Sequence, residues 1–386
     1  MPAPTSRDLI DQLVAFDTTS RESNLGLIGF VRGYLHEHGV ASTLIHDAEG
    51  RKANLWATIG PQDRGGVVLS GHTDVVPVDG QPWDTDPFAV TEADGRLYGR
   101  GTSDMKSFIA VVLAKLPQFL AAPLKTPVHL AFSYDEEVGC IGVHGIIDHI
   151  RAGTSGPLPK LAIVGEPTNM QVVDAHKGVF SVNTEVIGLE AHSSAPQSGV
   201  NAIHVAAEVL GRLKELQQEL EAFRDERFEP PFSTIQVGTI AGGTARNIIP
   251  LRCEFGWAIR PLPGIDPRPH FERWRDRVEK DLMPAMQAVD PSCCIRHRMG
   301  PVVQALSPQP GSAAEVLAFR LAGANRAHAV SYAAEAGAFQ KAGIPTVICG
   351  PGDIAQAHKP NEFIELSQVA ACESFMDRLT ASLCEG

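Results

Sequence analysis

Four apolar runs in this sequence each lead into a histidine or a run of carboxylates. VVLSGH ends at His72, LAFSYDEE ends at residues 135–137, LAIVGE ends at Glu166, and TVICG leads through a loop to His358. In an open parallel sheet, the carboxyl ends of the strands line one crevice, and ligands bind there. We therefore expect these side chains to converge at one edge of a sheet.

Strand and helix patterns alternate in the first half of the chain and again near its end. This alternation predicts an α/β domain whose sheet is largely parallel and flanked by helices. The expected strands cover residues 65–71, 127–134, 160–165 and 344–350. The expected helices cover residues 8–16, 26–40, 107–120, 143–153, 311–323 and 366–379.

Between these parts the order of elements changes to strand, helix, strand, strand, helix, strand. The corresponding segments are residues 179–188, 199–220, 233–242, 252–260, 269–289 and 293–299. This βαββαβ order is the ferredoxin-like α+β arrangement and is complete in itself. We therefore predict a discontinuous catalytic domain of residues 1–177 and 298–386, with an inserted domain of residues 178–297.

Length and charge exclude several classes of protein. The 386 residues exceed one ordinary core, and 44% hydrophobic with 20% charged residues is typical of a globular chain. A net charge of −12 argues against binding to nucleic acid or to an anionic membrane surface. No window reaches the roughly 18 apolar residues of a membrane span. We expect a cytoplasmic protein that acts on a small molecule.

The convergent groups suit a pair of zinc ions. Asp104 directly precedes an expected helix and joins the set, although a helix cap is the alternative reading of this aspartate. His72 and His358 with Asp104, Glu137 and Glu166 supply the nitrogen and oxygen ligands that zinc accepts. Three carboxylates offset three of the four charges of two divalent ions, and a bridging hydroxide offsets the fourth. A dinuclear centre is therefore the better hypothesis.

Two further acidic residues have expected roles beside this set. Asp74 lies two residues after His72 and is placed to accept the second N–H of that imidazole, which would fix its tautomer. Glu136 neighbours the ligand Glu137, and successive side chains of an extended chain point in opposite directions. Glu136 is therefore the expected general base.

Five motifs in order carry a family resemblance, namely SGHTDVVP, GRGTSDMK, DEEVG, GEPT and AHKPNEF. Across nearly the whole chain, the sequence resembles the acetylornithine deacetylase/succinyl-diaminopimelate desuccinylase family of dinuclear zinc amidohydrolases and metallopeptidases. The resemblance implies a zinc-peptidase-like catalytic domain. It also implies that His72 and Glu166 hold one zinc ion, Glu137 and His358 the other, and that Asp104 bridges them. Cobalt or manganese could replace zinc, and a cis peptide bond is expected after Asp104.

The same resemblance gives the inserted domain the role of a lid and dimerisation module in a homodimer. GLEAHSSAP is similar to the family's lid motif, so His192 is expected to stabilise the oxyanion, with a surface histidine as the alternative. Asn247 and Arg260 are expected to bind the substrate carboxylate, because the guanidinium fork suits that group. For Arg260 a structural salt bridge is the alternative. Glu335 is expected to face a substrate ammonium group, and a solvated helix residue is the alternative there.

The segment around Glu335 is most similar to the family members that hydrolyse N2-acetyl-L-ornithine to L-ornithine and acetate. We therefore expect a metal-dependent amidase with that substrate, acting through a metal-bridged hydroxide. Hydrolysis of succinyl-diaminopimelate, broad aminoacylase activity and carboxypeptidase activity are alternatives within the family. A metal-binding protein without catalysis is the alternative outside it, although the complete ligand set argues against that reading.

Overall fold

A computed structural model describes residues 3–154 and 156–385 of the chain. These residues form two compact units. The first unit contains the chain up to Ala175, Leu306–Ala329 and the chain from Ala334 onward. The second contains His176–Ala305 and Val330–Ala333. The first part of the chain therefore forms one core together with its C-terminal part.

An eight-stranded sheet forms the centre of the first unit, in the order β1-β2-β6-β3-β7-β14-β8-β13. Strand β3 pairs in parallel with β6 and β7, and β7 pairs in parallel with β14. Strands β1, β2 and β8 add antiparallel pairs on either side. The strands are β1 (Ser42–His46), β2 (Ala53–Ile59), β3 (Val67–His72), β6 (Val128–Ser133), β7 (Leu161–Pro167), β8 (Val173–His176), β13 (His328–Val330) and β14 (Thr346–Gly350). The predicted α/β class with a mostly parallel sheet is confirmed.

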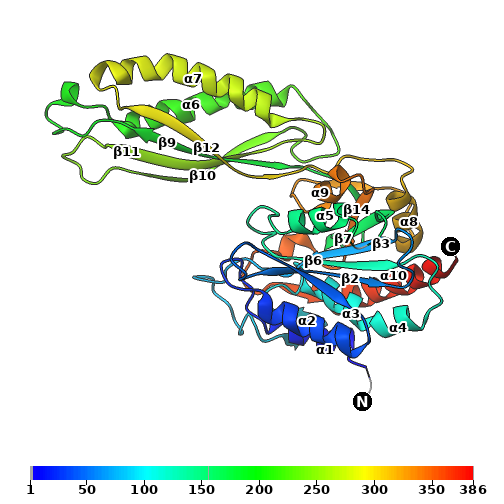
Figure 1. Ribbon diagram of the computed structural model, residues 1–386. Coiled ribbons are helices and arrows are strands. Elements are labelled where there is room, and N and C mark those ends of the chain that lie inside the picture. Colours follow the sequence, from blue (N-terminus) through cyan, green and yellow to red (C-terminus); the bar gives the residue numbers. More distant parts are fainter. Residues whose placement is uncertain (1–2, 155, 386) are drawn as a thin grey trace. The chain divides into compact units, whose positions relative to one another are not determined.

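Helices cover both faces of this sheet (Figure 1). On one face lie α5 (Val143–Arg151) and α9 (Ala336–Lys341). The other face carries the larger core, whose helices are α1 (Ser6–Val14), α2 (Leu25–Glu37), α3 (Lys106–Ala114), α4 (Leu116–Ala121), α8 (Ala313–Ala322) and α10 (Leu366–Glu385). Strands β3, β6, β7 and β14 are buried along their whole length, because helices pack on both sides of them. Among the helices of the described residues, none combines the length and the apolar character needed to cross a bilayer.

The single helix expected over residues 107–120 is wrong, because two helices, α3 and α4, occupy this stretch. Lys115 separates them, and Pro117 lies in the first turn of α4. Proline has no backbone N–H and its ring clashes with the preceding turn, so it is tolerated at a helix start but not inside a helix. The apolar periodicity continues across this proline, which is why the pattern alone indicated one helix.

A small antiparallel sheet joins two distant segments of the first unit. It has the order β15-β5-β4 and consists of β4 (Thr91–Ala93), β5 (Arg96–Tyr98) and β15 (Phe363–Glu365). Tyr98 pairs with Phe363, and their rings lie 5.5 Å apart. The segments that follow β5 and precede β15 are therefore held side by side.

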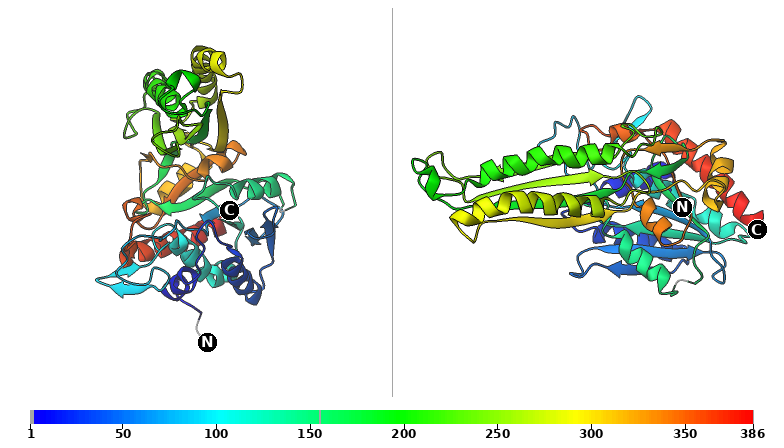
Figure 2. Two further views of the ribbon diagram at one scale, coloured as in Figure 1. Left: turned by 90° about the vertical axis from the view of Figure 1, so that its left-hand side faces the viewer. Right: turned by 90° about the horizontal axis from the view of Figure 1, so that it is seen from above.

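The second unit has the element order β9, α6, β10, β11, α7, β12 and a sheet in the order β10-β11-β9-β12. This is the strand order of the ferredoxin-like arrangement. The elements are β9 (Val179–Ile187), α6 (Ala202–Glu221), β10 (Thr234–Gly242), β11 (Arg252–Arg260), α7 (Pro267–Val289) and β12 (Cys294–Val303). Figure 2 shows α6 and α7 side by side on one face of this sheet. Phe180, Phe255 and Trp274 are central to the core between them.

The second unit extends beyond the predicted boundary of residues 178–297. Strand β12 continues to Val303, and Val303 pairs with Val179 at the start of β9. A register shift between Met299 and Val302 interrupts this ladder. The interruption explains why the sequence pattern ended at residue 299, since a bulge breaks the alternation of inward and outward side chains.

Close packing between α3 and β7 leaves no room for a side chain at Gly165. A Cβ atom at this position would overlap the aromatic ring of Phe108 on α3. Gly165 directly precedes Glu166 on β7, and both residues are buried. The glycine therefore allows the helix to approach the strand that delivers this glutamate.

We expect Gly165→Ala to lower the free energy of unfolding by about 1–3 kcal/mol, because the added methyl group overpacks a filled core. Urea denaturation followed by circular dichroism measures this loss. Gly33→Ala in α2 is the matched control, because no atom lies within 4 Å of the added Cβ there. That control should be neutral or stabilising by up to ~1 kcal/mol, since alanine favours a helix over glycine. Equal stability of the two variants would contradict the prediction.

Candidate metal centre

The carboxyl ends of three neighbouring strands deliver the acidic and imidazole groups to one place. His72 is the last residue of β3, residues 135–137 follow β6, and Glu166 lies near the end of β7. Because His72 pairs in register with Ser133 of β6, the segment after β6 begins beside this imidazole. Asp104 precedes α3, and His358 lies in the loop after β14. The predicted convergence is therefore present in the structure.

Asp104 lies between the two imidazoles. Its Oδ1 is 2.9 Å from His72 Nε2, and its Oδ2 is 3.5 Å from His358 Nε2. His358 Nε2 is also 3.0 Å from Glu137 Oε2, and His72 Nε2 is 3.7 Å from Glu166 Oε1. Each imidazole thus has one carboxylate of its own and shares Asp104 with the other.

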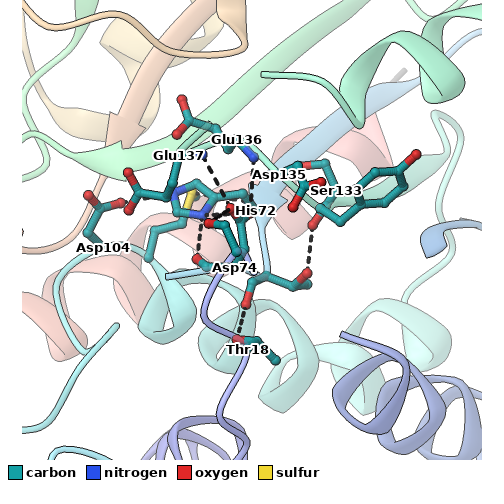
Figure 3. Close-up of polar contacts among 12 residues, drawn as sticks. Thr18, His72, Asp74, Asp104, Ser133, Asp135, Glu136 and Glu137 are labelled. Carbon is teal, nitrogen blue, oxygen red and sulfur yellow. Dashed lines mark hydrogen bonds and ion pairs between the residues drawn. The ribbon is translucent and has the colours of Figure 1, made fainter. Parts of the chain in front are cut away.

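Figure 3 shows three of these groups side by side, with His72, Asp104 and Glu137 facing one another. One ligand atom of each lies within 4.8 Å of the other two, which is the spacing of groups that can hold a metal ion. The peptide bond between Asp104 and Met105 is cis, as the family resemblance implies. The helix-cap alternative for Asp104 has no support, because α3 has no side-chain cap.

Burial and mutual repulsion define the electrostatics of the centre. Burial raises the pKa of the Glu136 and Glu166 carboxyls well above the usual range, and neighbouring carboxylates add to the effect. Although burial opposes it, hydrogen bonding to His358 and His72 lowers the pKa of Asp104. Hydrogen bonding to Asp104 and Glu137 raises the pKa of His358 to about 10. A divalent cation is the other means of offsetting this concentration of negative charge.

The donor set fits divalent metal ions. It contains two imidazole nitrogens and three carboxylates, with no cysteine sulfur among them, and zinc binds such nitrogen and oxygen ligands readily. His72, Asp104 and Glu166 are buried, Glu137 is partly buried, and the side chain of His358 is 54% exposed. A small molecule can therefore approach the centre from the side of His358.

Asp74 supports the centre in a different way from the expectation. His72 Nδ1 donates a hydrogen bond to the backbone carbonyl of Asp74 at 2.9 Å, and the Asp74 carboxylate lies 3.6 Å from the same nitrogen. The carboxylate instead accepts hydrogen bonds from the backbone N–H groups of Glu136 and Glu137, and from the Ser20 hydroxyl at 2.7 Å. Because these donors occupy both oxygens, Asp74 positions the acidic segment as well as the imidazole.

The three residues of the acidic run separate into different environments. Asp135 forms an ion pair with Lys52 and has no contact with the two imidazoles. Glu137 contacts His358, as described above. Glu136 Oε1 accepts a hydrogen bond from the Cys140 thiol at 3.2 Å. Glu136 is therefore left without a histidine partner, which suits a group that exchanges protons.

Glu335 is buried and is not a solvated helix residue. It lies at the start of α9 with 1% of its surface exposed, and Oε2 accepts a hydrogen bond from Ser70 on β3 at 3.4 Å. Burial raises the pKa of its carboxyl to about 7. Glu335 thus lies against the central sheet at Ser70, two residues before His72 in the chain, and its contact with a substrate ammonium group stays a prediction.

Three expected substrate contacts belong to the second unit. His192 is exposed, and its Nδ1 lies 2.7 Å from the Ser194 hydroxyl. The neighbouring Ser193 N–H donates to the Asn247 carbonyl at 3.0 Å, so the two predicted segments are adjacent. Arg260 ends β11 with an exposed side chain, and the described residues include no acidic group within ion-pair distance of it. The salt-bridge alternative for Arg260 therefore has no support.

Three residues around the centre escaped the sequence reasoning, namely Ser20, Cys140 and Glu362. Ser20 and Cys140 carried no signal, because a serine and a cysteine near a motif are common. Glu362 lies within AHKPNEF, four residues after His358, so its motif offered a signal. Its contacts are described below.

Comparison with known proteins adds a family, two relatives and two solved structures. The profile of peptidase family M20/M25/M40 matches residues 68–382. Acetylornithine deacetylases from Myxococcus xanthus and Proteus mirabilis are 36% and 34% identical, over 99% of this chain and 98% and 97% of the relatives.

The two solved structures are similar in fold. An M20 family metallo-carboxypeptidase from Sulfolobus solfataricus has a TM-score of 0.78 at 18% identity, covering 99% of this chain and all of the other. A dinuclear metal-binding M20 peptidase from Bacillus subtilis has a TM-score of 0.60 at 16% identity, covering 98% of both chains.

We expect zinc to raise the melting temperature of chelator-treated protein, because it binds the folded centre and not the unfolded chain. At a free zinc concentration 100 times the dissociation constant, the stabilisation is about 2.7 kcal/mol. Differential scanning calorimetry measures the shift. Asp104→Asn should remove most of it, whereas His36→Ala, which changes an exposed histidine on α2, should retain it. The same shift in Asp104→Asn and wild type would show that zinc binds elsewhere.

Proposed function

This chain belongs to peptidase family M20/M25/M40, and on that premise we propose that it hydrolyses N2-acetyl-L-ornithine to L-ornithine and acetate. The enzyme is a metal-dependent amidohydrolase. Two acetylornithine deacetylases that align with almost the full chain support the choice of substrate. The observation that carries the mechanism is the Asp104 carboxylate, whose two oxygens reach two different imidazoles.

We propose that the centre holds two divalent ions, zinc first among them, with cobalt or manganese as substitutes. His72 and Glu166 would hold one ion, Glu137 and His358 the other, and Asp104 would lie between them. The pairwise distances within this set, 3.0 Å for His358–Glu137 and 3.7 Å for His72–Glu166, support that division. When bound, such ions supply Lewis acidity to the scissile carbonyl and to the attacking water.

Glu136 acts as general base and then as general acid. It takes a proton from the attacking water and gives it to the leaving nitrogen of ornithine. Two contacts support this role. Asp74 holds the backbone N–H of Glu136 at 3.1 Å, and the Cys140 thiol donates to Oε1, so both the main chain and the carboxylate are oriented. Burial raises the pKa of this carboxyl, which favours its carrying a proton during turnover.

The second unit supplies the remaining substrate contacts in this proposal. His192 stabilises the oxyanion, and Asn247 and Arg260 bind the α-carboxylate of the substrate. The exposed guanidinium of Arg260 supports this role, because no acidic residue among those described competes for its donors. Glu335 contributes negative charge beneath the centre, which favours a cationic ornithine side chain.

We further propose that the chain is a cytoplasmic homodimer joined through the second unit. Strand β10 is the edge of its sheet and is exposed from Thr239 to Gly242. A cavity of about 380 Å³ lies beside it, lined by Leu210, Leu213, Lys214, Gln217, Ile235 and Val237. An unpaired strand edge beside an apolar hollow is a surface that a second sheet can cover.

A panel of amides tests the substrate. We expect the metal-supplemented protein to have its highest kcat/KM with N2-acetyl-L-ornithine, because the carboxylates of the centre favour a substrate with a cationic side chain. N-acetylmethionine, N-succinyl-diaminopimelate and a dipeptide are the competitors, and release of free amine is the measurement. A higher kcat/KM for any competitor would replace the proposed substrate, and absence of all hydrolysis would remove the catalytic function.

We expect Glu136→Ala to lower kcat by about 10²- to 10⁴-fold with its bound metal retained, because the variant loses proton transfer and no metal ligand. Steady-state kinetics and elemental analysis of the purified protein measure the two effects. Glu49→Ala is the control, since Glu49 is exposed and, among the described residues, no hydrogen bond or ion pair joins it to a group of the centre. A variant with near wild-type kcat would exclude Glu136 as the base, and loss of metal would reassign it as a ligand.

A further inference from the structure

The centre depends on two loops that come from distant parts of the chain. One loop follows β5 and carries Asp104, and the other precedes β15 and carries His358. These residues are the two ends of the 3.5 Å contact between Oδ2 and Nε2. The pairing of β5 with β15 brings the loops together, but the backbone contacts between them extend only one residue further, to the Gly99 N–H, which donates to the Glu362 carbonyl at 2.9 Å. Something beyond the strands must define the position of each loop.

Glu362 provides this connection. It belongs to the His358 loop, and its carboxylate accepts hydrogen bonds from the loop that carries Asp104. Oε1 accepts from the backbone N–H groups of Ser103 at 2.8 Å and Asp104 at 3.1 Å. Oε2 accepts from the backbone N–H of Gly101 at 3.1 Å. One carboxylate therefore accepts from three backbone N–H groups within residues 101–104, and the last of them belongs to the shared ligand.

Arg100 extends the connection to His358 itself. Its Nη1 donates to Glu362 Oε2 at 2.8 Å, and its Nη2 donates to Gln81 Oε1 at 2.6 Å. Gln81 Nε2 in turn donates to the backbone carbonyl of His358 at 3.0 Å. The chain from Glu362 through Arg100 and Gln81 thus returns to the residue that carries the exposed imidazole. Both loops are held by one hydrogen-bonded network.

The burial of the ion pair between Arg100 and Glu362 indicates a role other than stabilising the fold. The side chains of Arg100 and Glu362 are each 1% exposed. Removing two charges from water costs several kcal/mol, and an apolar pair of similar volume is often as stable or more so. An apolar pair, however, would leave the three backbone N–H groups that Glu362 satisfies without an acceptor, and a carboxylate binds such donors more strongly than a neutral oxygen does. The observed pair therefore suits a positioning function better than a purely stabilising one.

We propose that Glu362 is a positioning residue that sets the distance between Asp104 and His358, and thereby the affinity for the metal ion that His358 and Glu137 hold. It touches neither this ion nor the substrate. The inference rests on the proposed function, since it requires a metal ion at that side of the centre. It predicts that losing Glu362 affects the two ions unequally, because His72 and Glu166 lie on strands and are outside this network.

The test is calorimetric titration of metal-free, full-length protein with Zn²⁺. We expect Glu362→Gln to weaken one of the two binding steps by about 10- to 100-fold, the usual effect of losing a residue that orients a metal ligand. The other step should be unchanged. Glutamine has the shape of glutamate, but its NH₂ group would face donors. Unchanged affinity for both ions would overturn the proposal.

The matched control is Glu365→Gln, three residues along the same segment. Glu365 pairs with Arg96 at 3.5 Å, and their side chains are 50% and 40% exposed, so this pair also joins β15 to β5 but at the surface. Both zinc affinities should be retained in this variant. Equal losses in Glu362→Gln and Glu365→Gln would show that any weakening of the β5–β15 connection has the same effect, which would overturn a specific role for Glu362.

A double variant identifies which ion is affected. If Glu362 acts through His358, adding Glu362→Gln to His358→Ala should cause no further loss of zinc affinity, because the step it governs is already removed. Additive losses would overturn the proposal. If Glu362→Gln does not fold, Gln81→Ala decides the question, since it breaks the network without leaving a buried charge. It should weaken the same step by about tenfold, and unchanged affinity would overturn the proposal.

A failure of the positioning role can be distinguished from a failure of the proposed function. If wild-type protein binds no zinc, or hydrolyses no amide of the panel, the metal-dependent function fails whatever the variants do. If wild-type protein binds two ions and hydrolyses its substrate, but Glu362→Gln binds both ions as tightly, only the positioning role fails.

Discussion

The first unit must keep several carboxylates close together at a site that is shielded from water. Asp104, Glu136, Glu137 and Glu166 lie at the carboxyl edge of one sheet. Burial raises the pKa of the three glutamates, whereas in Asp104 hydrogen bonds to His358 and His72 outweigh burial and lower the pKa. Like charges at this spacing repel one another unless positive groups intervene. The two imidazoles provide part of this compensation, and Asp104 receives the larger share because it contacts both. A divalent cation held by these groups would supply the rest.

The surrounding fold keeps these groups from moving apart. Parallel pairing of β3 with β6 and β7 sets His72, the acidic segment and Glu166 at neighbouring strand ends. The absence of a side chain at Gly165 lets α3 pack closely against β7. Strands are rigid because their backbone groups are paired on both sides, so the ligands they carry need little further support. Asp104 and His358 come from loops. The hydrogen bonds of the buried Glu362 carboxylate hold these loops in position, as strand pairing holds His72 and Glu166.

The network around Asp74 shows how one side chain can serve two parts of the centre. Its carbonyl orients the His72 ring, while its carboxylate holds the main chain at Glu136 and Glu137. The proposed proton-transfer group, Glu136, and the proposed metal ligand, Glu137, therefore share one support. This arrangement explains why neighbouring residues of the acidic run have different partners, since the backbone between them is held at both N–H groups.

Much of the centre could be predicted from the sequence, for a physical reason. The apolar runs that end in His72 or Glu166 could be interpreted from the local sequence alone. A short segment shows both the continuous apolar pattern of a buried strand and the metal-binding chemistry of its last residue. The order of elements in the second unit was visible in the same way. The prediction failed where a local pattern continued across a structural break, as at Pro117 between α3 and α4, and at the shift between Met299 and Val302 in β12.

The sequence by itself therefore determined the fold class, the order of the elements and the residue types of the centre, because these follow from local periodicity and side-chain chemistry. Only the tertiary structure decided which atoms meet. It directed the Asp74 carboxylate to backbone N–H groups, buried Glu335 against β3, and made Glu362 the acceptor for the Asp104 loop. Such pairings depend on the packing of segments far apart in the chain, and no short stretch of sequence contains both partners.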